Sequence, residues 1–245
     1  MTEWREIFLE NDLTFFCQID IIESTRQGGE EIMQSYSKRV SMTVIKRLPK
    51  YYQYLKDLED KGIEKISSKD LAEMMGLTAS QIRQDLNAFG AYGQQGYGYK
   101  VVELKNAIKE ILGLNSQYNC VIIGAGNLGH AIANYERFKN EGIHIRAMFD
   151  ADKSLVGKKI GNLDVYHIDE LPDFVERQPV DLCVLSVPRE VGQKIVNDVI
   201  GLGIKAFLNF VPLDLTVPED VVVENVNITD SLFTLTYLLN ERAEA

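Results

Sequence analysis

The sequence is poor in cysteine, in histidine and in long apolar runs. Its three cysteines, Cys17, Cys120 and Cys183, are far apart and form no Cys-x-x-Cys pair, which argues against a disulfide framework and against a structural zinc site. No apolar run approaches the roughly 18 residues of a membrane span, and acidic residues stand near the amino terminus where a secretory signal needs positive charge. We therefore expect a cytoplasmic protein with no metal and no membrane partner.

The composition is typical of a folded protein. Of 245 residues, 45% are hydrophobic and 25% are charged, and this length suits one large domain or two small ones. The net charge of −10 is unevenly spread, at −6 over residues 1–35, +4 over residues 36–110 and −8 over residues 111–245. A basic segment in an acidic chain favours a polyanionic partner at one end only, although charge alone is also compatible with a solvated surface.

Residues 1–35 show weak periodicity, an acidic bias and a Gly28-Gly29 break. Two interpretations are open, a helical extension or a tail that is present only because the start codon was placed too far upstream. Met33 and Met42 are the alternative starts. We favour the second interpretation, because nothing in this segment matches the pattern of the rest, and we treat residues 1–35 as an extension without predicted structure.

Residues 36–113 predict a mostly helical domain. Apolar residues recur every three or four positions at Leu48, Tyr51, Tyr52, Leu55 and Leu58, which is the spacing of one helix face. Helix-capping patterns then open two short segments, Ser-x-x-Asp at Ser67 and Thr-x-x-Gln at Thr78, with a turn at Gly76 between them. Two short helices joined by a tight glycine-containing turn are typical of a helix-turn-helix. Alternating glycine and tyrosine over residues 90–99 predict a β-hairpin, and a helix over residues 102–112 follows.

A helix-turn-helix places the amino end of its second helix in the DNA major groove. The side chains available there are Ser80, Gln81, Arg83 and Gln84, and arginine and glutamine suit hydrogen bonding to guanine and adenine. On the preceding predicted helix, Lys46, Arg47 and Lys50 suit phosphate contacts, which position a protein without reading sequence. The alternative is a helical oligomerisation module whose polar helix faces solvent.

From residue 118 onward, short β-branched runs alternate with helical segments. The predicted strands span residues 120–123, 145–149, 165–167, 182–187, 206–210 and 221–226, and a terminal helix spans about 230–241. This alternation predicts a parallel sheet that is covered by helices.

The first of these strands runs into a Gly-x-Gly-x-x-Gly motif, made of Gly124, Ala125, Gly126, Asn127, Leu128 and Gly129. Its glycines allow a tight turn, a close approach of a pyrophosphate and close packing of the next helix. Asp150 lies twenty-one residues beyond Gly129, at the end of the second strand. A carboxylate there binds ribose hydroxyls and repels a 2′-phosphate, so the pattern predicts an NAD(H) site.

No second domain supplies a substrate pocket or a dedicated proton donor, because residues 151–227 are needed to complete the sheet. We therefore expect no catalytic residues and no enzyme. Two alternatives stay open. One is a small NAD-dependent oxidoreductase with an interaction module in front, and the other is a protein that binds CoA or a nucleotide.

These motifs, in this order, closely resemble the Rex redox-sensing transcriptional repressors. The stretches that carry the resemblance are residues 46–52, 82–86 and 89–99, then 124–129, 149–150, 186–188 and 208–212. The resemblance covers roughly residues 40–242 and leaves the first 35 or so residues unmatched.

The resemblance implies an α/β protein, with an amino-terminal winged helix-turn-helix domain over residues 36–113 and a Rossmann NAD(H)-binding domain over residues 114–228. It further implies a homodimer in which the terminal helix, residues 229–245, is exchanged between subunits. Such a repressor would bind operator DNA and release it when NADH binds, and so would sense the NADH/NAD⁺ ratio.

The resemblance also assigns residues. The wing residues Gln94, Gln95 and Gly96 would meet DNA together with Arg47 and Arg83. Tyr135, Val187 and Pro188 would contact the dinucleotide together with the glycine motif and Asp150. One position pair departs from the family, since some members join a helix arginine to an aspartate after the last strand through a ligand-dependent ion pair. Gln53 and Asn227 stand at those positions here, so a charged latch is not expected.

Overall fold

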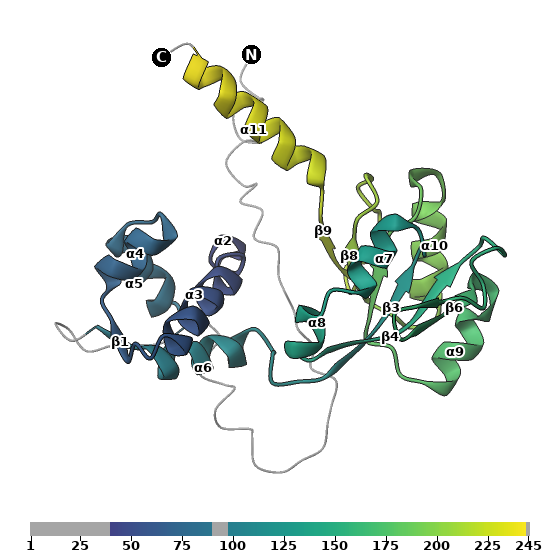
Figure 1. Ribbon diagram of the computed structural model, residues 1–245, viewed down its shortest axis with the longest axis horizontal. Coiled ribbons are helices and arrows are strands. Elements are labelled where there is room, and N and C mark those ends of the chain that lie inside the picture. Colours follow the sequence, from purple (N-terminus) through teal and green to yellow (C-terminus); the bar gives the residue numbers. More distant parts are fainter. Residues whose placement is uncertain (1–39, 90–97, 244–245) are drawn as a thin grey trace, which may run out of the picture. The chain divides into compact units, whose positions relative to one another are not determined.

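The computed structural model describes residues 40–89 and 98–243 (Figure 1). It consists of two compact units, which divide between Gly113 and Leu114. Each unit has its own buried core, and each is described by itself. Within the described ranges, no helix is both long enough and apolar enough to cross a membrane. The extension of residues 1–35, which includes Cys17, lies outside the described residues.

The first unit is helical with one small two-stranded sheet. Its elements are α2 (Met42–Ile45), α3 (Leu48–Asp60), β1 (Lys65–Ile66), α4 (Ser68–Met75), α5 (Ala79–Asn87), β2 (Tyr99–Lys100) and α6 (Val101–Ile111). The core takes fully buried side chains from four of these helices, among them Leu55, Leu71, Ile82 and Leu104. All five apolar residues that predicted α3 are buried, so the amphipathic interpretation of that segment is confirmed.

The helix-turn-helix forms through the local signals that predicted it. The Ser67 hydroxyl accepts a hydrogen bond from the Asp70 N–H at 3.1 Å and caps α4. Gly76 ends α4 in the left-handed region, with a φ of 69°, where glycine carries no steric penalty. The Thr78 hydroxyl then accepts from the Gln81 N–H at 3.2 Å and caps α5. Both predicted caps are therefore confirmed.

The small sheet joins β1 and β2 as an antiparallel pair, in which Ile66 faces Tyr99. Tyr99 is the last residue of the predicted hairpin, and its pairing with β1 was not predicted. Residues 90–97 lie outside the described residues, and with them the predicted wing residues Gln94, Gln95 and Gly96.

The second unit is built on a seven-stranded sheet. Its strands are β3 (Tyr118–Ile123), β4 (Ile143–Asp150), β5 (Lys159–Ile160), β6 (Leu163–His167), β7 (Leu182–Leu185), β8 (Ala206–Asn209) and β9 (Val222–Asn225), in the spatial order β5-β6-β4-β3-β7-β8-β9. All neighbours are parallel except β5 and β6. The remaining elements are α7 (Asn127–Ala133), α8 (Arg137–Asn140), η1 (Ile168–Glu170), α9 (Leu171–Arg177), α10 (Arg189–Gly201) and α11 (Ile228–Ala243).

Helices cover both faces of this sheet, because alternate residues of each buried strand point to opposite sides. Ile122 packs with α7 and α8, whereas Val121 and Ile123 pack with α9 and α10. The strand order reverses between β3 and β7. Ligands of open α/β sheets bind at such a switch point, beyond the carboxyl ends of the strands. The fold therefore places the glycine motif, which follows β3, where this rule expects a site.

Several elements differ from the sequence prediction, most of them by one or two residues at a boundary. The strand predicted for residues 182–187 ends at Leu185, and Pro188, which has no N–H to donate, is already the N-cap residue of α10. The short antiparallel strand β5 was not predicted, since two residues carry no periodic signal. The terminal helix is longer than expected and begins at Ile228.

Candidate functional site

The turn after β3 and the first turn of α7 each need a glycine at one position. Gly124 has a φ of +102°, and a Cβ there would lie 2.3 Å from the backbone oxygen of Ser186. A Cβ on Gly129 would lie 2.0 Å from the backbone oxygen of Gly124. Gly126 differs, since a Cβ there would meet nothing within 4 Å. The space beside Gly126 is therefore open to a ligand, which is the role predicted for this glycine.

Asp150, at the end of β4, fastens this turn. Its Oδ2 accepts a hydrogen bond from the Ala125 N–H at 2.6 Å, and its Oδ1 accepts from the Asp152 N–H at 2.8 Å. A carboxylate has about four lone-pair positions, so two accepted bonds leave capacity for ribose hydroxyls. The tie to Ala125 was not predicted, because it depends on the register of β3 and β4.

A pocket of about 1010 Å³ lies over the switch point. Seven of the ten predicted cofactor residues line it, namely Gly124, Gly126, Asn127, Leu128, Asp150, Val187 and Pro188. The other three do not. Ala125 is buried and holds Asp150, and Gly129 is buried beneath the turn. Tyr135 is 47% exposed and packs edge-on against Phe138, with 5.1 Å between the ring centroids.

Several lining residues were missed by the sequence analysis. An apolar wall comes from η1, α9 and α10, through Ile168, Leu171, Val191 and Ile195. Ser186, after β7, donates its hydroxyl to the Gly124 oxygen at 3.0 Å and so braces the turn. For Ser186 and α10 the usable signal was positional, because both follow β7, which borders the switch point. The elements η1 and α9 follow β6, which β4 separates from β3, so their part in the wall depends on the tertiary fold.

The second candidate site is the outward face of α5. Ser80, Arg83 and Gln84 are exposed and Gln81 is half-buried, whereas Ile82 and Leu86 are in the core. The helical period therefore separates the predicted base-reading residues from the packing residues. Arg83 also donates to the Ser68 hydroxyl at 3.1 Å, which holds its side chain along the start of α4.

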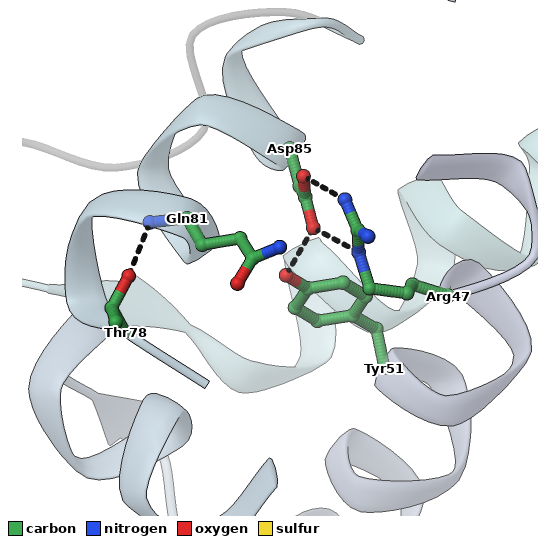
Figure 2. Close-up of polar contacts among 5 residues, drawn as sticks. All are labelled: Arg47, Tyr51, Thr78, Gln81 and Asp85. Atoms are coloured by element: carbon green, nitrogen blue, oxygen red, sulfur yellow. Dashed lines mark hydrogen bonds and ion pairs between the residues drawn. The ribbon is translucent and has the colours of Figure 1, made fainter. Parts of the chain in front are cut away.

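Arg47 and Lys50, both predicted to contact phosphate, have hydrogen-bond partners inside the domain. Arg47 donates through Nε and Nη2 to the two carboxylate oxygens of Asp85, at 2.8 and 2.7 Å (Figure 2). Lys50 donates to the backbone oxygen of Met75 at 2.9 Å. Lys46 is exposed. Neither of the two internal contacts could be found from sequence, since their partners are 38 and 25 residues away.

Asn227 and Gln53 are the two residues that the resemblance placed where some Rex members have a charged latch. Asn227 is engaged locally, since its Oδ1 accepts from the Thr229 N–H at 3.0 Å and its Nδ2 donates to Asp230 at 2.8 Å. It thus caps the start of α11. Gln53 is exposed on α3.

Two cysteines are described, and both are buried strand residues. Burial raises the pKa of the Cys120 thiol to about 12 and raises that of Cys183 well above its usual range. Both thiols therefore stay protonated and unreactive in the folded state. The described part of the chain holds no cluster of three or more His, Cys, Asp or Glu side chains that could bind a metal ion.

Comparison with known proteins identifies both units. The family model "Putative DNA-binding protein N-terminus" matches residues 39–87, and the model "CoA binding domain" matches residues 115–213. The Redox-sensing transcriptional repressor Rex of Clostridioides difficile (strain 630) is 54% identical over 84% of this chain and 98% of its own length. The protein of the same name from Clostridium botulinum (strain Hall) is 52% identical over 83% of this chain and 97% of its own length.

Solved structures extend the similarity to the whole architecture. One of them is RSP, described as a Rex-family repressor, which was solved in a complex with NAD⁺ and operator DNA. That structure matches this chain with a TM-score of 0.79 at 50% identity, and the match covers 83% of this chain and 94% of RSP. Its complex with NADH gives a TM-score of 0.78 at 48% identity, covering 83% of this chain and 96% of that one. On this identity, carried across both units, the chain belongs to the Rex family of redox-sensing transcriptional repressors.

Proposed function

We propose that this protein is a DNA-binding transcriptional repressor that senses the NADH/NAD⁺ ratio, and that NADH binding releases its operator. The observation that carries the proposal is the match, at 48–50% identity over both units, to a repressor solved with NAD⁺ and operator DNA and with NADH. Its relatives are named as repressors, and it is not an enzyme. We infer a cytoplasmic location, where bacterial operator DNA lies.

NAD(H) is the cofactor that the pocket residues fit. The open face at Gly126 admits a pyrophosphate close to the backbone, and the spare acceptor capacity of Asp150 suits ribose hydroxyls. The apolar wall beyond Asp150 suits a flat heterocycle. We assign cofactor contacts to the seven lining residues predicted from sequence, and supporting roles to Ala125 and Gly129. Tyr135 remains a proposed contact of the nicotinamide end, on the resemblance alone.

Operator DNA is the proposed ligand of α5. Arg83 and Gln84 are exposed beside Ser80 on a capped helix whose opposite face is buried, as base reading in the major groove requires. We assign a phosphate contact to Lys46 and wing contacts to Gln94, Gln95 and Gly96. The proposed division of labour gives DNA binding to residues 36–113, NAD(H) binding to residues 114–228 and dimer formation to residues 229–245.

A homodimer is proposed from the terminal helix. Every side chain from Ile228 to Arg242 is exposed in the single chain, and in Figure 1 α11 extends beyond the end of β9 without covering the sheet. The apolar side chains left in solvent include Ile228 at 60%, Leu232 at 55%, Phe233 at 66%, Leu235 at 52% and Leu239 at 58% exposed. So large an apolar surface marks an interaction site, and exchange of this helix with a second copy would cover it.

Placing charge on this helix should abolish the dimer. Leu235→Asp combined with Leu239→Asp would bury two carboxylates in the proposed interface, which costs several kcal/mol for each unpaired ion. We expect sedimentation equilibrium to give a dimer for the parent protein and a monomer for the double variant. Glu241→Gln, on an exposed position of the same helix, is the control that should stay dimeric. A double variant that remains dimeric would remove α11 from the interface.

Coupling between the two ligands is the direct test of the sensor. Two recognition helices must span half-sites about 34–36 Å apart, so an NADH-bound arrangement that changes this spacing lowers operator affinity. NADH must then bind one arrangement more tightly than the other. We expect operator DNA to weaken NADH binding by the same factor as NADH weakens operator binding, about 5- to 150-fold. Calorimetric titration with NADH, in the presence and in the absence of operator, measures the NADH affinity of the bound and of the free protein. Equal NADH affinities would contradict the proposal.

CoA binding is the second candidate, because the family model that matches residues 115–213 is that of a CoA-binding domain. The carboxylate of Asp150 beside the pocket disfavours additional phosphate groups on the ribose. Competition between CoA and NADH for the pocket distinguishes the two, and we expect NADH to remain bound in excess CoA. The oxidoreductase alternative predicts turnover of a carbonyl substrate with NADH, and we expect stoichiometric binding without turnover.

A further inference from the structure

We propose that Arg47 is a positioning residue, which governs operator selectivity by fixing the recognition helix α5 through Asp85 and not through a DNA phosphate. The inference rests on the proposed function, since it concerns the same DNA-binding face. The sequence predicted that Arg47 contacts a DNA phosphate at the surface, whereas this inference assigns its role to the ion pair with Asp85 inside the domain.

The Asp85 carboxylate is the centre of this arrangement. It belongs to α5 and is 2% exposed, so it cannot contact DNA in the folded domain. Among the described residues, its side-chain hydrogen bonds come from the start of α3, two from Arg47 and one from the Tyr51 hydroxyl at 2.9 Å (Figure 2). A buried carboxylate is costly unless it is fully paired, so α5 is stable only where these donors reach it.

The Arg47–Asp85 pair constrains the orientation of α5 more strongly than the apolar packing around it does. Ile82 and Leu86 bury α5 against the core, but apolar burial has no direction and tolerates small rotations of the helix. Two parallel N–H···O bonds from one guanidinium fix both the distance and the orientation of the carboxylate. The hydrogen bond to Asp85 raises the pKa of Arg47, and burial together with the same carboxylate raises the pKa of Tyr51, so both donors keep their protons.

Asp85 lies on the buried side of α5, and the proposed base-reading residues lie on its exposed side. A rotation of the helix would therefore move Arg83 and Gln84 by an equal angle. Base-edge hydrogen bonds need placement to within about 0.5 Å and 10–20°. The Arg47–Asp85 pair is thus expected to set sequence selectivity, while non-specific attraction to the phosphate backbone depends on surface charge.

A direct phosphate contact by Arg47 is the competing explanation. Its side chain is 22% exposed, and a guanidinium has five N–H donors, of which two face Asp85. The two explanations differ in what Asp85 does. If Arg47 acts on a phosphate, Asp85→Asn removes a competing negative charge and leaves DNA binding unchanged or tighter. If Arg47 positions α5, Asp85→Asn damages selectivity although it lies away from the DNA.

The test uses the full-length protein and a duplex that it selects from a random-sequence pool, with a scrambled duplex of equal length. For Asp85→Asn and Arg47→Gln, we expect the affinity ratio between the two duplexes to fall about tenfold, with an unchanged slope of log affinity against log salt. The double variant should be no worse than either single variant, because both break one interaction. Lys46→Gln is the control, and should weaken both duplexes equally and lower the salt slope by about one.

The outcomes are separable. Wild-type selectivity in Asp85→Asn, or a lower salt slope in Arg47→Gln, would overturn the inference and make Arg47 a phosphate contact. Should Asp85→Asn fail to fold by circular dichroism, Tyr51→Phe decides, since it removes only the hydroxyl bond to Asp85. The inference then requires a smaller loss of selectivity at unchanged salt slope, and full selectivity would refute it. Failure of the proposed function would appear differently, as the absence of any enriched duplex for the parent protein.

Discussion

Gly129→Ala is expected to destabilise the second unit and to abolish NADH binding together. The added Cβ would lie 2.0 Å from the backbone oxygen of Gly124 and 3.2 Å from the Met148 side chain. Backbone cannot yield as a flexible side chain can, so the cost reaches or exceeds the upper end of the 1–3 kcal/mol typical of overpacking. We expect the melting temperature to fall by roughly 5–10 °C, measured by calorimetry, with no detectable NADH binding.

Gly126→Ala is the matched variant in the same motif. A Cβ at this position meets nothing within 4 Å, and the residue has an ordinary φ of −76°. The melting temperature should therefore stay within about 1 °C of the parent value, while NADH binding is lost because the methyl group fills the space needed by the pyrophosphate. If Gly126→Ala bound NADH normally, or if Gly129→Ala melted with the parent protein, the assigned roles of the two glycines would be wrong.

The second large effect is the separation of the two binding activities. Asp150→Ala removes the proposed ribose contact together with the hydrogen bond that fastens the turn at Ala125, and a hydrogen bond to a charged group contributes about 1.5–3 kcal/mol. We expect NADH to bind about 10- to 150-fold more weakly, with operator affinity unchanged in the absence of NADH. The operator complex of this variant should then survive NADH concentrations that dissociate the parent complex. Asp173→Asn, on the exposed side of α9 and outside the pocket, is the control for loss of charge.

Arg83→Ala should produce the reverse result. Loss of a bidentate base contact costs about 1–3 kcal/mol, which corresponds to roughly 5- to 150-fold in operator affinity, with NADH binding unchanged. Arg83→Lys keeps the positive charge but lacks the planar guanidinium that makes two parallel hydrogen bonds. We expect it to lose nearly as much preference for the operator as Arg83→Ala does. Fluorescence anisotropy with operator DNA and calorimetry with NADH measure the two activities. If either alanine variant lost both activities, the division of labour between the two units would be contradicted.

Sequence patterns were informative wherever a signal is local. The caps at Ser67 and Thr78 form within three residues of their partners. The glycine motif acts locally, because Gly124 takes a positive φ and Gly129 packs against the Gly124 backbone five residues away. Four residues of the motif, Gly124, Gly126, Asn127 and Leu128, line the pocket, whereas Val187 and Pro188, which also line it, were assigned by the resemblance. Tyr135 had no local signal, being assigned by resemblance, and it lies outside the pocket lining.

By itself the sequence determined the helix-turn-helix, the strand–helix alternation and the position of the glycine motif, since periodicity, caps and turn residues act over a few positions. Only the tertiary structure decided which distant groups meet. It placed the apolar wall of α9 and α10 beside Asp150, and it paired Arg47 with an Asp85 carboxylate 38 residues away. Side-chain partners follow from how the helices pack and how the strands are ordered, and neither leaves a periodic trace in the chain.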